Sequence, residues 1–182
     1  MLTLVHAFMG LPPVVAGLVT FLVLARSGPL GRFELIYTPA AMVIVQVILA
    51  TPVIAGFAHA SMQGVEPGLG LQALSLGATR VQAVFVKMRE ARAGLTAAVI
   101  AGFGRVIAEV GAVMIVGGNI KGQTRVLTTD IVLQTRQGGY SLALAEGMVL
   151  ILVVVLVNIF LTWCQGNRPV REDRRRVTGL ES

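Results

Sequence analysis

The sequence predicts an all-α integral membrane protein, and three observations lead to this fold class. First, 55% of its 182 residues are hydrophobic and only 13% are charged, whereas soluble domains carry about 25% charged residues. Second, four long stretches are nearly free of charge, and about 20 apolar residues are enough for one helix to cross a bilayer. Third, Lys and Arg are unevenly distributed over the segments between these stretches. We therefore expect a polytopic helical bundle with about four transmembrane helices.

The first two apolar stretches are expected to hold the first two membrane helices. Residues 1–25 contain Pro12 and Pro13, and proline removes a backbone donor and clashes with the preceding turn, so this helix should bend or restart there. Such a break is either a simple kink or backbone that lines a pathway. We expect no cleaved signal peptide, because the start lacks a basic region and the prolines interrupt its apolar core. Residues 35–65 should begin the second helix near Pro39.

The third and fourth stretches, residues 93–120 and 141–167, carry ionisable side chains. Arg105 and Glu109 lie in the third stretch, and Glu146 lies in the fourth. An ionisable side chain near the bilayer centre costs about 2.5 to 3.5 kcal/mol on insertion scales and rarely faces lipid. We therefore expect these three side chains to face protein or water.

The segment between the second and third stretches, residues 66–92, is too polar to cross a membrane and is expected to form two short helices. Its apolar residues recur at three- and four-residue intervals, which is typical of a surface helix with one apolar face. These residues are Leu74, Ala78, Val81 and Phe85. Gly77 marks the expected tight turn, and a helical loop of this kind suits docking to a partner. Residues 121–139 should form another short helix, near the membrane interface.

The distribution of Lys and Arg indicates the orientation, because cytoplasmic segments are enriched in these residues. Nine of them, four in residues 66–92 and five in the tail after Asn167, compare with five in the two loops on the other side. We place the loop and the C-terminus in the cytoplasm of a multi-pass protein of the plasma (inner) membrane. Beside a membrane, a basic tail ordinarily contacts anionic lipid, although it also resembles a nucleic-acid-binding arm. We favour membrane lipid and expect no nucleic acid partner.

The chain should therefore consist of one transmembrane domain followed by a tail. The domain comprises residues 1–165, with a cytoplasmic loop at 66–92 and an external loop at 119–140. The basic cytoplasmic tail comprises residues 166–182.

Arg105 and Glu109 are the first candidate functional residues. Four positions apart on a helix, they share one face, and the small residues at 98, 102 and 112 on the same face permit close helix approach. Two interpretations stay open. The pair either neutralises itself and fixes helix packing with little net stability, or Arg105 offers a positive charge to an anion path while Glu109 holds it in place. Glu146 is the other candidate partner.

Gly117, Gly118 and Asn119 follow where the third helix should end. Such a run is typical of C-terminal capping in the left-handed region, and a gate is the alternative role. No catalytic or metal site is predicted, because the two histidines are isolated and a single cysteine excludes a multi-cysteine metal site. No phosphate-binding loop of the Walker type occurs. We therefore expect that the chain is not itself an enzyme, does not hydrolyse ATP and binds no cofactor.

The cytoplasmic loop contains two short motifs, ALSLGATR at residues 73–80 and EARAGL at residues 90–95. With these motifs it resembles the coupling loop of binding-protein-dependent ABC importer permeases. It implies that short helices sit in a groove of an ATPase subunit, which would carry ATP and Mg²⁺, with Ala73, Gly77, Arg80 and Glu90 in the coupling loop. Leu71 replaces the acidic residue that usually opens the motif.

Four further segments are informative: residues 104–112 (GRVIAEVGA), 117–120 (GGNI), 9–15 (MGLPPVV) and 26–31 (RSGPLG). They resemble the oxyanion branch of this family, which includes molybdate, sulfate and tungstate permeases. Together they most resemble tungstate permease subunits, and the likeness covers nearly the whole chain. Such permeases usually begin with additional membrane sequence, so we expect that this chain is a fragment or has a misplaced start.

The resemblance implies an ATP-driven importer of tungstate, molybdate or sulfate, built as a homodimer that works with an ATPase and an extracytoplasmic binding protein. Arg105, Glu109 and the Gly117–Asn119 run are then candidates for the substrate path or gate. Two other classes stay open. A membrane-embedded enzyme could use Glu109 or Glu146 as a general base, and an ATP-independent channel or assembly subunit would leave the coupling loop without a purpose.

Overall fold

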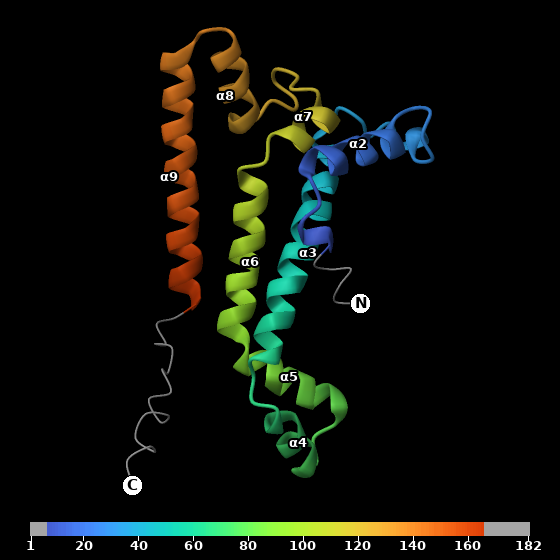
Figure 1. Ribbon diagram of the computed structural model, residues 1–182, viewed down its shortest axis with the longest axis vertical. Helices are drawn as coiled ribbons and strands as arrows, with labels where there is room; N and C mark the ends of the chain where they lie inside the picture. Colours follow the sequence, from blue (N-terminus) through green and yellow to red (C-terminus); the bar gives the residue numbers. More distant parts are fainter. Residues whose placement is uncertain (1–6, 166–182) are drawn as a thin grey trace.

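The computed structural model describes residues 7–165, which are helical throughout apart from turns and short connections (Figure 1). The basic tail and residues 1–6 lie outside the described residues. The elements, in chain order, are α2 (Pro13–Leu24), the 3-10 turn η1 (Gly31–Phe33), α3 (Pro39–Gln63), α4 (Gly68–Ser75), α5 (Arg80–Glu90), α6 (Arg92–Ile107), α7 (Gly111–Gly117), α8 (Leu127–Arg136) and α9 (Tyr140–Gln165).

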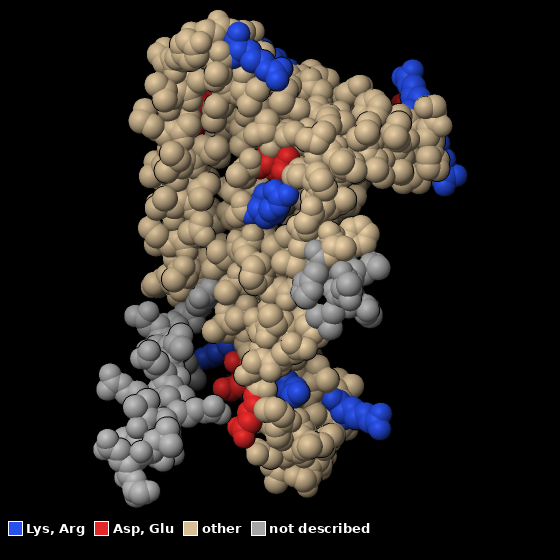
Figure 2. All heavy atoms as spheres, viewed as in Figure 1, with Lys and Arg blue, Asp and Glu red and all other residues tan. Residues whose placement is uncertain are grey.

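Two long helices, α3 and α6, run side by side through the middle of the molecule, and α9 stands beside α6 (Figure 1). The helices α4 and α5 lie at one end of this bundle, and α2, α7 and α8 lie at the other (Figure 1). On the face shown in Figure 2, charged side chains lie mainly near the two ends, with a largely uncharged surface between them. This distribution is the one expected for a protein that crosses a membrane.

Within residues 7–165, α3 and α9 are each long and apolar enough to cross a membrane, and α6 with α7 forms a third, bent candidate. The predicted third helix is therefore two helices, which meet at an angle of 62°. The predicted start of the second helix is confirmed. Pro39 occupies the first turn of α3, and Thr38 Oγ1 accepts a hydrogen bond from the Ala41 amide at 3.4 Å.

The restart predicted at Pro12 and Pro13 is confirmed, but the described part of the first predicted span is corrected, because it holds no helix long enough to cross a membrane. A short turn of helix at residues 7–9 ends at Gly10, and α2 starts afresh at Pro13. The 12 residues of α2 rise only about 18 Å, which is less than the roughly 30 Å of hydrocarbon. Moreover, α2 runs crosswise to α3 (Figure 1). The prolines therefore separate two helices rather than kink one.

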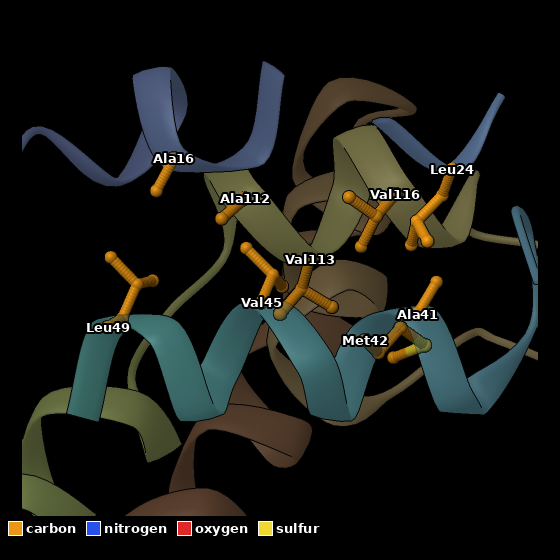
Figure 3. Close-up of a cluster of buried hydrophobic side chains, with 9 residues drawn as sticks. All are labelled: Ala16, Leu24, Ala41, Met42, Val45, Leu49, Ala112, Val113 and Val116. Atoms are coloured by element: carbon orange, nitrogen blue, oxygen red, sulfur yellow. The ribbon is translucent and has the colours of Figure 1, made fainter. Parts of the chain in front are cut away.

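A cluster of buried apolar residues lies where α2 and α7 pack on the first half of α3 (Figure 3). Its members are Ala16, Leu24, Ala41, Met42, Val45, Leu49, Ala112, Val113 and Val116. Small residues let the backbones come close together. A Cβ added to Gly17 of α2 would lie 2.7 Å from the Ala112 Cα of α7. This contact positions α7 and therefore the break that precedes it.

Candidate functional site

The break between α6 and α7 interrupts the third apolar stretch with a bend of 62°. Helix α6 ends at Ile107, and α7 begins at Gly111. The first amide groups of a helix have no hydrogen-bond partners inside that helix. Glu109 provides an acceptor for one of these amides of α7. Its Oε1 accepts a hydrogen bond from the Ala112 amide at 3.1 Å. Glu109 thus caps α7 with its own side chain.

Arg105 and Glu109 form the predicted ion pair across this break. Arg105 Nη1 lies 3.5 Å from Glu109 Oε2. The two side chains differ in exposure, since 34% of the Arg105 side chain is accessible and only 7% of the Glu109 side chain. The carboxylate is therefore fixed inside the protein, and the guanidinium keeps part of its surface free for another group.

Helix α8 is tied to the same break. Thr128 Oγ1 donates a hydrogen bond to the Glu109 carbonyl at 3.4 Å. An open cavity of about 770 Å³ lies beside this contact, between α3, α8 and α9. Its walls are mainly apolar, and its charged lining residues are Glu109, Arg125 and Asp130. Sequence reasoning missed Thr128 and Arg125, because nothing in their local pattern indicates that the external loop folds back onto the break.

Glu146 does not serve as the second partner that the sequence suggested for Arg105. Its charged neighbours are Asp130 of α8 and Arg125. Arg125 Nη1 lies 3.8 Å from Asp130 Oδ1, and Gln134 Nε2 donates to the same oxygen at 3.3 Å. These groups form a second polar cluster, which joins α8 to α9 rather than α9 to α6.

The Gly117–Gly118–Asn119 run closes α7 as a cap. Gly118 and Asn119 adopt φ angles of 70° and 51°, as predicted for the left-handed region. Thr124 Oγ1 donates to the Gly117 carbonyl at 2.5 Å and accepts from the Ile120 amide at 2.9 Å. The Tyr37 amide donates to the Val116 carbonyl at 2.9 Å. These bonds anchor the end of α7 and support the capping interpretation over that of a loose gate.

The loop at residues 66–92 forms the two predicted helices, α4 and α5, with a turn at Gly77 whose φ is +89°. The start of α5 is fixed locally, because Thr79 and Gln82 form a reciprocal capping box. Ala73 lies in α4, whereas Arg80 and Glu90 are the first and last residues of α5. The structure therefore brings the predicted coupling residues together in one hairpin and leaves the break at the other end of α6.

No family model matches the chain, but curated relatives do. It is 43% identical to a probable anion ABC transporter permease protein of Haloferax volcanii, over 92% of this chain and 75% of the relative. It is 41% identical to the tungstate uptake system permease protein TupB of Peptoclostridium acidaminophilum, over 84% of this chain and 67% of the relative.

This chain belongs to the oxyanion permeases of ABC transporters. The permease is more distant from the molybdenum transport system permease protein ModB of Azotobacter vinelandii, to which it is 29% identical over 82% of its length. It therefore resembles tungstate permeases more than this molybdenum permease. Family and apolar helices together identify a multi-pass membrane protein whose function is transport.

Proposed function

We propose that this permease is the membrane subunit of an ATP-driven, binding-protein-dependent importer of tungstate. Two relatives named as tungstate permeases are 41% and 35% identical to it, and two named for molybdenum are 29% and 26% identical. Molybdate or sulfate carried by the same mechanism is the alternative. The difference in identity supports tungstate.

The α4–α5 hairpin is the observation that carries the ATP-driven mechanism. It projects from the bundle (Figure 1) and exposes large apolar side chains, among them Leu71, Val81 and Phe85, with Leu76 at the turn 88% accessible. Exposed apolar residues gathered on one projecting element mark a protein interface. An ATPase subunit would cover this surface. Motion of the ATPase would then pass to α3 and α6, because the hairpin connects directly to both helices.

ATP and Mg²⁺ would bind to this ATPase, since the permease sequence has no Walker loop. The hairpin, and with it the C-terminus, would face the cytoplasm, and the end with α2, α7 and α8 would face the extracytoplasmic binding protein. Two copies of the permease would form the transporter, with alternating access at their interface.

Arg105 is our candidate for contact with the transported anion. It lies within the apolar zone of the molecule, and a positive charge there requires a partner or water. Glu109 satisfies only part of the guanidinium, and the remainder is accessible. The break exposes this cation without exposing its counter-ion, an arrangement that suits the transient binding of an oxyanion.

The decisive experiment is uptake of labelled tungstate by cells that express the permease with its ATPase and its binding protein. We expect uptake to require all three proteins and to resist competition by unlabelled molybdate and sulfate. Strong competition by molybdate or sulfate would leave the proposed mechanism intact and would show that tungstate is not the preferred substrate. Uptake that continues without the ATPase would reject the ATP-driven mechanism in favour of a channel.

A further inference from the structure

The cavity between α3, α8 and α9 has no role in the proposed transport path. Its volume of about 770 Å³ lies within the roughly 300–1,000 Å³ that is usual for ligand pockets. Apolar side chains form most of its wall, among them Met42 of α3, Ile107 of α6 and Val153 of α9. The cavity is open, and α3 and α9 are both candidate spans. Because the hydrocarbon region holds no water, acyl chains of the bilayer can fill this apolar part.

Arg125 lies at the polar end of the cavity, and its hydrogen bonds are incomplete. Its Nη1 is 3.8 Å from Asp130 Oδ1, and its Nη2 donates to the Asn119 carbonyl at 3.5 Å. Both distances exceed the about 2.7 to 3.2 Å of a well-formed hydrogen bond. Its Nε has no hydrogen-bond partner within residues 7–165, and 24% of the side chain is accessible. The guanidinium can therefore donate to an acceptor inside the cavity.

Two carboxyl groups accompany this arginine. Asp130 lines the cavity, and Glu146 of α9 lies near both Asp130 and Arg125. Glu146 Oε2 has no hydrogen-bond partner in the part of the chain that the structure describes. Glu109 also lines the cavity, but Arg105 balances its charge. Two carboxylates against one guanidinium leave an excess of negative charge, so the cluster lacks a cationic donor as well as an acceptor.

The cluster lies near one edge of the hydrocarbon region. Tyr140 and Trp163 stand at the two ends of the apolar part of α9, and both are exposed. Tyr and Trp at such positions mark the two membrane interfaces. Glu146 comes six residues after Tyr140, which is about 9 Å along a helix. Charged groups at this depth require partners, and a long arginine side chain there can reach lipid phosphate groups.

We propose that the cavity binds one molecule of phosphatidylethanolamine. An acyl chain lies along the apolar wall, the phosphate accepts hydrogen bonds from Arg125, and the ammonium group donates to Asp130 and Glu146. Phosphatidylglycerol would bring an anion without a cation to a cluster that already has an excess of negative charge. Phosphatidylcholine has no N–H donor for the carboxylates. The site depends on the membrane placement of α3 and α9 and not on which oxyanion the permease carries.

The test is lipid exchange on the purified permease, measured by native mass spectrometry. The protein in detergent is stripped of lipid and is then incubated with equal amounts of phosphatidylethanolamine, phosphatidylglycerol and phosphatidylcholine that carry the same acyl chains. We expect the permease to retain one phosphatidylethanolamine, in preference to either other lipid by about tenfold, which corresponds to one charge-assisted hydrogen bond.

Charge variants test the two halves of the headgroup contact. Arg125→Gln should lower the retention of all three lipids by about tenfold, because each has a phosphate group. Arg125→Lys keeps the positive charge and should restore most of the retention, which separates a lost phosphate contact from a lost fold. Glu146→Gln removes the excess of negative charge, so the preference for phosphatidylethanolamine over phosphatidylglycerol should disappear while phospholipid still binds.

A pair of tryptophan variants on α9 tests the apolar wall. Val153 lines the cavity, whereas Val155 does not, and the two side chains are similarly accessible at 38% and 46%. Val153→Trp should fill part of the cavity and weaken the retention of every lipid. Val155→Trp is the matched control and should retain lipid like the unaltered permease.

Three other outcomes would overturn the proposal. Equal retention of the three lipids, or equal effects of the two tryptophan variants, would show that lipid adheres to the apolar surface without a specific site. Displacement of the retained lipid by tungstate or inorganic phosphate would assign Arg125 to a free oxyanion instead. An unaltered permease that retains no lipid would leave the cavity to another polypeptide, such as a second copy of the chain.

Discussion

Glu109 has two roles at once, and only one of them is encoded in local spacing. Its pairing with Arg105 follows from their separation by four residues. Its capping of Ala112 does not, because in a continuous helix the Ala112 amide would bond to the Ala108 carbonyl. The cap depends on the break, and the break depends on the packing of α7 against α2. Sequence patterns therefore predicted the ion pair and missed the reason for its position.

Neutral replacement of both charges separates the two interpretations of the pair. In the double variant Arg105→Gln and Glu109→Gln, the amide at 109 can still accept the hydrogen bond from Ala112, and no buried charge is left unpaired. We expect normal amounts of protein in the membrane but tungstate uptake reduced by about tenfold or more, the value of one charge-assisted hydrogen bond.

Glu109→Gln alone serves as the control, because it leaves the Arg105 charge without its counter-ion and should lower the amount of folded protein. Full uptake by the double variant would mean that the pair only fixes helix packing. Membrane fractions probed by antibody, together with labelled tungstate uptake, distinguish these results.

Gly17 makes the contact that positions α7, and its replacement should destabilise the permease. The Cβ of Gly17→Ala would lie 2.7 Å from a backbone atom of Ala112, and a backbone atom cannot rotate away. Overpacking of this kind costs about 1 to 3 kcal/mol. Gly147→Ala is the matched control, because a Cβ there meets nothing within 4 Å. Thermal melting of the purified protein in detergent should show a lower Tm for Gly17→Ala only.

At the scale of elements, the α4–α5 hairpin was predictable and the arrangement of α2 and α7 was not. The hairpin is specified locally by Gly77 in its turn and by the Thr79–Gln82 capping box. The crosswise course of α2 accompanies tertiary packing against α7 and α3, which are distant from it in sequence. An apolar stretch with prolines has the same composition whether it forms one kinked membrane helix or two separate helices. Periodicity alone does not distinguish these two structures.

Gly77→Val tests the role of the hairpin, and the same substitution at another glycine with a positive φ serves as the control. A left-handed backbone costs a residue with a side chain about 1 to 2 kcal/mol, so the turn should change its shape. We expect loss of ATPase co-purification and of uptake, with the protein still in the membrane. Gly138→Val is the control, because Gly138 also has a positive φ and free space around it but lies between α8 and α9. Equal loss of ATPase binding by both variants would contradict docking at the hairpin.

At the scale of the whole molecule, composition was sufficient for the fold class, and charge distribution gave an orientation. Three candidate spans within residues 7–165 agree with the apolar stretches that include α3, α6 and α9. The position of α9 could not be predicted, because its apolar residues surround the whole helix and mark no preferred face. In the structure, α9 packs against α8 and α6, and Glu146 of α9 lies near Asp130 and Arg125.

The orientation can be tested on the intact chain with two cysteine variants made in a Cys164→Ser background. The variants are Leu76→Cys and Lys121→Cys. Leu76 lies at the exposed turn of the hairpin, and Lys121 lies in the exposed loop after α7, at the opposite end of the molecule. A maleimide that cannot cross membranes should label Lys121→Cys in spheroplasts and should label Leu76→Cys only after permeabilisation. The reason is the nine-to-five distribution of Lys and Arg, which favours a cytoplasmic hairpin. The reverse pattern would place the hairpin outside, where no ATP is available, and the ATPase-docking proposal would fail with the orientation.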